Sequence, residues 1–161
     1  MVINAQAGVS QVSPDNWAEQ AVSNVPQMKR ILLVDDEAHV LRVMKLSLER
    51  NGYDVDTALS GDVALSMLRE QDYHALITDL DMPKMSGRHL CKTVRSRHGD
   101  SILIFVIVST ASDDAVDAVP EQLDWIKSEV NMESLEKPVS LRWIVARLNE
   151  FFGDYELAGV L

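Results

Sequence analysis

Residues 75–87 read Ala-Leu-Ile-Thr-Asp-Leu-Asp-Met-Pro-Lys-Met-Ser-Gly, and they combine a strand-like beginning with a loop-like end. The first residues are mostly apolar and lead directly to Asp79. Pro83 and Gly87 then interrupt any strand, because proline cannot donate a hydrogen bond to a sheet and glycine is frequent in turns. Asp79 is therefore predicted to be displayed at the end of a strand. Taken alone, this position suits equally a carboxylate that caps the next helix and one that carries out chemistry.

Strands and helices are predicted to alternate on both sides of this stretch. The apolar run Ile31-Leu32-Leu33-Val34 has no polar alternation, which is typical of a strand covered on both faces. In residues 53–57, Tyr53, Val55 and Thr57 alternate with Asp54 and Asp56. This alternation predicts a strand with one face in water, at the edge of the sheet. Such alternation with short loops predicts an α/β fold, with helices on both faces of a parallel sheet. The predicted strands are 31–34, 53–57, 73–78, 102–108 and 132–136, and the predicted helices are 38–50, from Ser60, from Gly87 to about 98, from 120 to about 130, and from Ser140.

The chain of 161 residues has the length of one domain, which the pattern places at residues 28–152. Its last helix is predicted to be capped by Ser140 and to bury Phe151. Residues 153–161 then form a C-terminal tail.

Residues 1–27 form an N-terminal extension that is polar and rich in small side chains. Pro14 resembles the first residue of a helix, with Trp17, Ala21 and Val22 on one side of it. Two interpretations stay open for this extension, a flexible segment and a short docking helix, because an isolated helix of this length is marginal in water.

The composition excludes several classes of protein. A formal net charge of −10 and a pI near 4.7 argue against nucleic-acid binding, which needs a basic face. Cys91 is the one cysteine, so the chain can form neither an internal disulfide nor a Cys-x-x-Cys zinc site, and a reducing cytoplasm is expected. The longest apolar run is too short to span a bilayer, so no membrane association is expected.

Polar side chains follow four of the predicted strands, at the point where each strand ends. Because the carboxyl ends of parallel strands meet at one crevice, these side chains are expected to lie together. Each residue type alone is ordinary, but the shared position in the order of elements predicts a site. The residues are Asp35 and Asp36 after the first strand, Asp79 after the third, Ser109 and Thr110 after the fourth, and Lys137 after the fifth.

Four motifs stand at these strand ends and in the loops that follow them: Leu33-Val34-Asp35-Asp36-Glu37, Asp79-Leu80-Asp81-Met82-Pro83 with Gly87, Ser109-Thr110-Ala111, and Lys137-Pro138. With these motifs, residues 28–152 resemble the receiver domain of two-component response regulators, the phosphoacceptor module typified by the chemotaxis regulator. The resemblance implies a flavodoxin-like, doubly wound sheet of five parallel strands in the order 2-1-3-4-5.

The resemblance implies that Asp79 accepts a phosphoryl group from a phosphohistidine on a sensor histidine kinase or a histidine phosphotransfer protein. It also implies one Mg²⁺ ion. Its ligands are Asp36, Asp79, the main-chain carbonyl of Asp81 and, through water, Asp35. Lys137 then pairs with the phosphoryl oxygens. Phosphorylation is expected to switch the binding of an unknown downstream protein.

The switch is implied to use the Thr110 hydroxyl, with Ser109 as the alternative because the strand register is ambiguous by one residue. The chain departs from the family before its fifth strand. Receivers usually carry Gly-Ala where this chain has Val130-Asn131, and an aromatic residue where it has Ser134. The segment between Thr110 and Lys137 is also several residues longer than usual. These departures put the aromatic-coupled form of the switch into question.

We expect a stand-alone response regulator that catalyses only its own phosphorylation and dephosphorylation and is not otherwise an enzyme. Two alternatives remain. Asp79-Leu80-Asp81 also fits the Asp-x-Asp motif of haloacid-dehalogenase-like phosphatases, although those enzymes usually carry it on their first strand. The altered region before Lys137 also fits a receiver-like interaction module that signals without phosphorylation.

Overall fold

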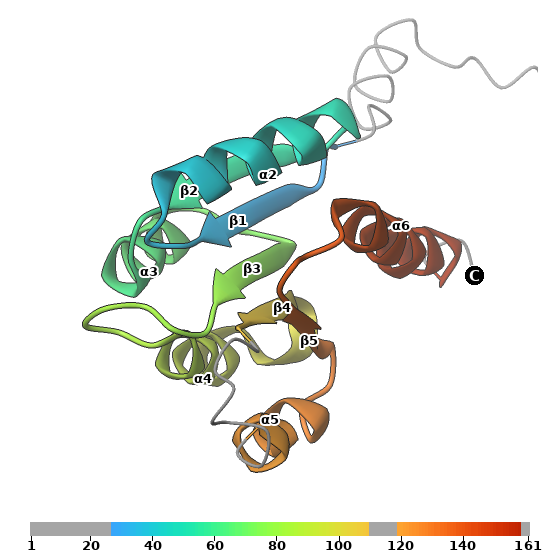
Figure 1. Cartoon of the computed structure of the whole chain (residues 1–161). Helices are drawn as coiled ribbons and strands as arrows, with labels where there is room; N and C mark the ends of the chain where they lie inside the picture. The colour runs from blue at the N-terminus through green and yellow to red at the C-terminus, as the bar shows by residue number, and fades with distance from the viewer. Residues whose placement is uncertain (1–26, 110–118, 159–161) are drawn as a thin grey trace, which may run out of the picture.

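Five parallel strands form the centre of the molecule (Figure 1). The structure, a computed structural model, describes residues 27–109 and 119–158. Neighbouring strands are parallel throughout the sheet, and their order β2-β1-β3-β4-β5 confirms the predicted doubly wound topology. The strands are β1 (Arg30–Val34), β2 (Asp54–Ala58), β3 (Ala75–Asp79), β4 (Leu103–Val108) and β5 (Met132–Glu136).

Helices cover both faces of the sheet, as predicted. One face carries α2 (Ala38–Arg50) and α6 (Leu141–Ala158). The other face carries α3 (Gly61–Glu70), α4 (Gly87–His98) and α5 (Val119–Lys127), with the short 3-10 helix η1 (Gly99–Ser101) after α4. Within residues 27–109 and 119–158, none of the helices is both long and apolar enough to cross a membrane.

The sheet divides the apolar core into two layers. Along β1, Leu32 and Val34 enter the layer under α3, α4 and α5, whereas Ile31 and Leu33 enter the layer under α2 and α6. This division follows from the alternation of side chains along a strand. Because both sides are covered, the inner strands read as continuous apolar runs in the sequence.

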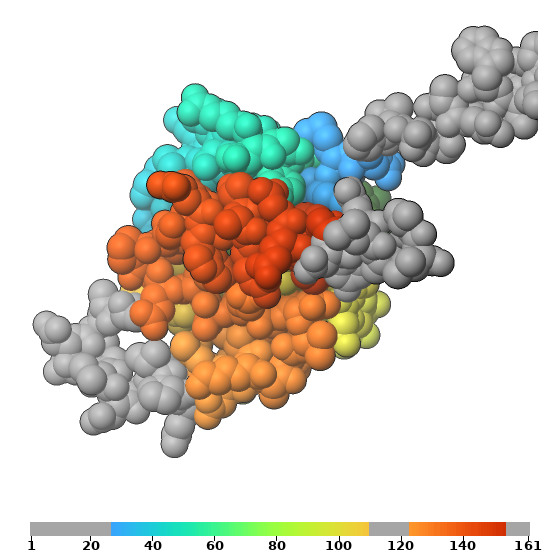
Figure 2. Space-filling model, turned by 90° about the vertical axis from the view of Figure 1, so that its right-hand side faces the viewer, coloured from blue at the N-terminus to red at the C-terminus, as the bar shows by residue number. Residues whose placement is uncertain are grey.

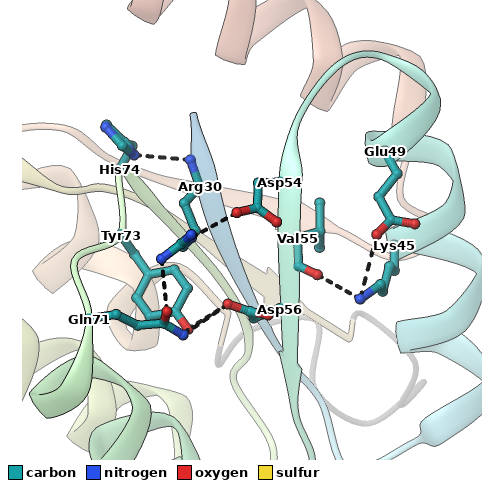
Figure 3. Close-up of polar contacts among 9 residues, drawn as sticks. All are labelled: Arg30, Lys45, Glu49, Asp54, Val55, Asp56, Gln71, Tyr73 and His74. Carbon is teal, nitrogen blue, oxygen red and sulfur yellow. Dashed lines mark hydrogen bonds and ion pairs between the residues drawn. The ribbon is translucent and has the colours of Figure 1, made fainter. Parts of the chain in front are cut away.

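The edge strand β2 has a polar covering, as its acidic alternation predicted. Figure 3 shows Arg30 donating from Nε to Oδ2 of Asp54 at 2.9 Å and from a terminal nitrogen to Oε1 of Gln71 at 2.8 Å. The amide nitrogen of Gln71 and the hydroxyl of Tyr73 donate in turn to Oδ2 of Asp56, at 3.0 and 2.9 Å. These bonds tie β2 to β1 and to the loop before β3.

The helix starts follow the predicted capping residues. The Ser60 hydroxyl accepts from the backbone N–H of Val63, and the Ser140 hydroxyl accepts from the backbone N–H of Trp143, each at 3.3 Å.

The last helix differs from its prediction in two details. Phe151, which was predicted on the buried face, packs against the core but is only partly buried, whereas the neighbouring Phe152 is 8% exposed. The helix α6 also continues to Ala158, so the predicted tail 153–161 is helical as far as that residue. The hydrophobic period alone leaves two adjacent phenylalanines ambiguous, because either one fits an apolar stripe of this width.

The turn before β5 is held by a buried arginine on α4. The guanidinium of Arg95 donates to the carbonyl oxygens of Gly99 and Ile102 at 2.9 and 2.8 Å. It also donates to the carbonyl oxygens of Val130 and Asn131 at 2.7 and 2.8 Å. Asn131 has a φ of 56°, a left-handed conformation that asparagine tolerates better than most residues. The departure from Gly-Ala is therefore accommodated by a residue suited to this turn and by the arginine that binds its carbonyls.

Candidate functional site

The described residues of the predicted site meet at the carboxyl edge of the sheet. Asp35 directly follows β1, Asp79 is the last residue of β3, and Lys137 directly follows β5. The ammonium nitrogen of Lys137 lies 3.4 Å from Oδ1 of Asp79. Ser109 is exposed immediately after β4, whereas Thr110 lies outside the described residues. The predicted convergence of strand ends is therefore confirmed for the first, third and fifth strands.

Three carboxylates crowd this edge. Asp35, Asp36 and Asp79 each place one carboxylate oxygen so that the three oxygens lie within 4.8 Å of one another. Asp35 and Asp79 are 3% and 4% exposed, whereas Asp36 is exposed. Such close negative charges repel, and burial weakens the screening by water.

Two oxygens of this cluster have no hydrogen bond among the described residues, although both are buried. They are Oδ2 of Asp35 and Oδ1 of Asp79. The other oxygen of Asp35 accepts from the backbone N–H of Glu37 at 2.8 Å. The contact between Lys137 and Asp79 is an ion pair and not a well-formed hydrogen bond. Because unsatisfied buried oxygens are costly, the cluster is arranged to receive a further positively charged or hydrogen-bonding group.

The same crowding changes the pKa of the buried acids. Burial raises the pKa of Asp79 above its ordinary value, and the Lys137 ammonium opposes that rise. The negative charges of Asp35 and Asp81 push the pKa of Asp79 further upward. Burial likewise raises the pKa of Asp35, against the hydrogen bond from the Glu37 amide. A bound cation would favour the charged form of both groups.

The donor set fits a hard divalent cation. Its oxygens are carboxylates, two of them buried and without hydrogen-bond partners, and Mg²⁺ prefers oxygen ligands. Asp81 is exposed on the loop after β3, and its carboxylate is not part of the cluster in the described residues. The main-chain carbonyl of Asp81 therefore stays a predicted ligand, as does the water-mediated role of Asp35.

The loop that carries this site is tightly built around Gly87. The Leu80 N–H donates to the carbonyl of Ile107 at 2.8 Å, and the Gly87 N–H donates to the carbonyl of Leu80 at 2.9 Å. A Cβ atom at position 87 would collide with the carbonyl oxygen of Asp79 and would lie 2.9 Å from Cα of Leu80. Only glycine therefore lets α4 begin this close to the end of β3.

The role of Asp79 as a helix cap is excluded by the start of α4. The cap of α4 is Ser86, whose hydroxyl accepts from the backbone N–H of His89 at 3.3 Å. Asp79 instead faces Lys137 and the other acids. Of the two interpretations that the sequence left open, the capping role is wrong and the chemical role remains.

Beside the cluster lies a hollow of about 400 Å³ that the sequence did not reveal. Asp35 and Lys137 form its polar end, and its walls come from α2 and from the start of α6. No motif marks it, because its walls are apolar residues with ordinary helical spacing. The apolar lining residues are Val40, Val43, Met44, Ile107, Val139 and Leu141.

Comparison with known protein families gives one match that covers most of the domain. The family model of the response regulator receiver domain matches residues 31–149. This span runs from the second residue of β1 to the middle of α6.

Curated relatives carry the same kind of domain as part of a longer chain. The alkaline phosphatase synthesis transcriptional regulatory protein PhoP of Bacillus subtilis is 30% identical over 131 residues, which are 81% of this chain and 51% of PhoP. The response regulator MprA of Mycobacterium avium is 34% identical over 119 residues, which are 74% of this chain and 49% of MprA. The chain thus spans about half the length of the curated relatives that it matches.

Solved structures agree with the topology. A response regulator receiver domain protein from Clostridium thermocellum has a TM-score of 0.68 at 25% identity, covering 81% of this chain and 99% of that one. The chemotaxis response regulator CheY4 of Vibrio cholerae has a TM-score of 0.64 at 26% identity, covering 77% of this chain and 98% of that one.

Proposed function

Because the chain belongs to the response regulator receiver domain family of two-component signalling, we propose that Asp79 is its phosphoacceptor. The phosphoryl donor in this proposal is a phosphohistidine on a sensor histidine kinase or a histidine phosphotransfer protein. One observation carries the assignment. Oδ1 of Asp79 is buried without a hydrogen bond and faces the Lys137 ammonium at 3.4 Å.

The proposed transfer is a displacement at phosphorus. A carboxylate oxygen of Asp79 attacks the phosphorus atom, and the P–N bond to the imidazole of the partner breaks. The electron pair of that bond stays on the imidazole nitrogen. Asp36, Asp79 and the main-chain carbonyl of Asp81, with Asp35 through water, would hold a Mg²⁺ ion, which would supply charge neutralisation to the phosphoryl group.

Lys137 supplies the permanent positive charge of the site. Its ammonium is only one-third exposed and already lies next to the attacking carboxylate. As the phosphoryl group arrives, the same ammonium is placed to pair with one of its oxygens. The protein then contributes mainly orientation and charge stabilisation, which is the usual division of work in phosphoryl transfer.

The readout proposed for this step begins at the end of β4. The phosphoryl group attracts the hydroxyl of Thr110, or that of Ser109, and the following segment changes the surface offered to a downstream protein. Ser134 is exposed on β5, where the family usually has an aromatic residue. A switch that depends on moving an aromatic ring at that position is therefore not part of the proposal.

The test is phosphorylation by a small donor, read by intact mass. With Mg²⁺ and acetyl phosphate, the wild-type chain is expected to gain the mass of one phosphoryl group, and removing Mg²⁺ with EDTA is expected to abolish the gain. Asp79→Asn should stay unmodified, whereas Asp62→Asn, an exposed acid in the first turn of α3, should react like wild type. Full modification of Asp79→Asn would refute the assignment.

Two further measurements separate the alternatives. A haloacid-dehalogenase-like phosphatase would turn over a generic phosphate ester many times per chain, and we expect no such turnover. A module that signals without phosphorylation would bind neither Mg²⁺ nor the phosphoryl mimic beryllofluoride. We expect beryllofluoride to shift the amide NMR signals of residues next to Asp79 only when Mg²⁺ is present.

A further inference from the structure

The outer side of α4 carries three cations, although the chain as a whole has a net charge of −10. Arg88, Lys92 and Arg97 are exposed, and we name these three residues the α4 basic face. Leu90 and Val94, on the other side of the helix, are fully buried. The sequence of α4 contains no acidic residue. In Figure 1, the helix lies between α3 and α5 on one face of the sheet.

None of these three cations is neutralised within the part of the chain that the structure describes. Cations of other elements form ion pairs with acids there, but Arg88, Lys92 and Arg97 form none. Arg95, the fourth cation of α4, has a structural use. It binds the carbonyl oxygens before β5, and its Nε lies 3.9 Å from a carboxylate oxygen of Glu129. The fold therefore uses Arg95 and leaves the other three positive charges in water.

Helix stability does not account for the whole α4 basic face. The partial positive charge at the start of a helix favours acidic side chains there, and cations are favourable only near its end. Arg97 lies in the last turn of α4 and fits this rule. Arg88 lies in the first turn, where α4 has no acidic residue, and Lys92 lies in the middle of the helix. The position of Arg88 costs the helix some stability, which favours a use outside the helix.

Arg88 is also held in place by an aromatic side chain. Its guanidinium carbon lies 5.6 Å from the centre of the Trp125 ring on α5. Trp125 is itself partly buried and packs against the core. Stacking on an aromatic face orders the guanidinium before binding and leaves its N–H groups free to donate to a carboxylate. Arginine and tryptophan are also the residue types that most often anchor protein interfaces.

We infer that the α4 basic face binds an acidic segment of another protein, with Arg88 as the anchor. Arg88 and Lys92 are about 6 Å apart along the helix axis, and Arg97 is about 14 Å from Arg88. Carboxylates one turn apart on a partner helix match the first spacing. The structure describes all of α4, and this helix exposes no large apolar side chain. The contact is therefore electrostatic and depends on salt.

The charge of the rest of the chain favours a protein segment over a nucleic acid. Binding to nucleic acid needs a broad basic surface, because each neutralised phosphate adds to the affinity. Three cations make a narrow patch, and a chain with a net charge of −10 repels a polyanion that extends beyond them. A short acidic segment of a protein avoids this repulsion, because its charge ends where the patch ends.

The test titrates the full chain with an acidic peptide and follows the amide NMR signals. The probe is a peptide of about 16 residues that repeats Glu-Ala-Ala-Ala, which places its carboxylates one helical turn apart. We expect shifts of the signals of Arg88, Lys92 and Arg97 in about 50 mM salt, and their loss in about 500 mM salt. The same peptide with lysine in place of glutamate should cause no shifts. Absence of shifts on α4 with the acidic peptide would overturn the inference.

Two double variants test whether the α4 basic face is the binding surface. Arg88→Glu with Lys92→Glu is expected to weaken binding about tenfold or more, because two attractive contacts become repulsive. Arg42→Glu with Arg50→Glu is the matched control, since it changes the net charge equally at two exposed positions of α2. It should bind within about twofold of wild type. Equal losses in the two double variants would indicate general charge attraction and would refute the inference.

The control positions are well separated from the α4 basic face. The helix α2 packs on one face of the sheet and α4 on the other. Figure 2 shows the side of the molecule with α2 and α6, from which most of α4 is hidden. A peptide bound along α4 therefore does not contact the control positions.

Three further measurements separate other occupants of the α4 basic face. Duplex DNA of about 20 base pairs is expected to shift no signal of α4. Dilution of the free chain should also leave these signals in place, which excludes a second copy. Residues 110–118 contain Asp113, Asp114 and Asp117, and changing all three to asparagine should leave the affinity for the peptide unchanged. Shifts with DNA, shifts on dilution or much tighter binding in the asparagine variant would each assign the face to a different occupant and refute the inference.

Discussion

The ammonium nitrogen of Lys137 lies 3.4 Å from Oδ1 of Asp79, and this ion pair reaches across β4 from the end of β5 to the end of β3. Both residues reach this place through the sheet, since 57 residues separate them in the sequence but only one strand separates them in space. The Lys137 ammonium favours the charged form of the buried Asp79 carboxylate. It also lies where it can bind the phosphoryl group of the proposed reaction.

Lys137→Met is expected to slow phosphorylation of Asp79 by about 10- to 100-fold, because a hydrogen bond to a charged group contributes about 1.5–3 kcal/mol. The same change should raise the pKa of Asp79 further, since Lys137 is the group that lowers it. Intact mass over time measures the rate, and ¹³C NMR of the carboxyl group measures the pKa. Lys92→Met, an exposed site on α4, is the control that should change neither.

Mg²⁺ is expected to stabilise the wild-type chain, because it binds the folded cluster of three acids and not the unfolded chain. At a concentration 100 times the dissociation constant the gain is about 2.7 kcal/mol in the free energy of unfolding. Urea denaturation with and without Mg²⁺ measures it. Asp36→Asn should lose most of this gain, whereas Asp62→Asn should keep it. An equal gain in both variants would contradict the proposed ligand set.

His74 is expected to make stability depend on pH. Burial and the charge of Lys29 lower its pKa, and its Nδ1 accepts from the backbone N–H of Arg30 at 3.0 Å (Figure 3). The folded state therefore binds the proton less readily than the unfolded state. Stability is full above the ordinary pKa of 6.5 and falls as the pH drops from there toward the lowered pKa of the folded state.

Urea midpoints measured from pH 7.5 downward check this dependence. His74→Gln removes the titrating group and should flatten the part of the profile that lies below the ordinary pKa of histidine. His89→Gln, on the exposed side of α4, should leave the profile as it is in wild type. A profile of His74→Gln that matches wild type would assign the pH dependence to other groups.

Arg95→Ala is expected to lower the free energy of unfolding by about 2–4 kcal/mol, because the carbonyl oxygens that Arg95 binds lose charged donors. Arg95→Lys should recover only part of this, since one ammonium lacks the planar fork that serves several acceptors. Arg97→Ala, exposed on the same helix, is the matched control and should change stability little. Denaturation in urea measures all three.

Gly87→Ala is expected to lower stability by about 1–3 kcal/mol through overpacking, since its methyl group would meet the main chain of Asp79 and Leu80. The displaced carbonyl should also slow phosphorylation. Gly153→Ala, where a Cβ meets nothing within 4 Å, should have neither effect. Normal phosphorylation in a destabilised Gly87→Ala would show that the loop can shift without moving the carboxylate.

Much of the fold was predictable because it is encoded locally. The alternation of Asp54 and Asp56 with apolar residues predicted the edge strand, and the apolar runs predicted the inner strands. Ser60 and Ser140 predicted the starts of two helices, because a capping hydroxyl accepts a hydrogen bond from an amide only three residues further along the chain. The receiver motifs predicted which strand ends would meet. Four expectations stay predictions. They are phosphorylation by a histidine kinase or phosphotransfer protein, a downstream protein target, a cytoplasmic location and the absence of nucleic-acid binding.

By itself, the sequence determined the order of elements and the identity of the acidic residues and lysine, because these depend on spacing along the chain. The strand order followed from the resemblance to receiver domains. The tertiary structure alone decided that Ser86 and not Asp79 caps α4, that Phe152 is buried more deeply than Phe151, and that Arg95 holds the turn before β5. It also decided that Oδ1 of Asp79 is buried without a hydrogen bond beside Lys137, and that a hollow of about 400 Å³ lies next to Lys137 and Asp35. These facts depend on side chains brought together from distant segments, and such contacts leave no period or motif in the sequence.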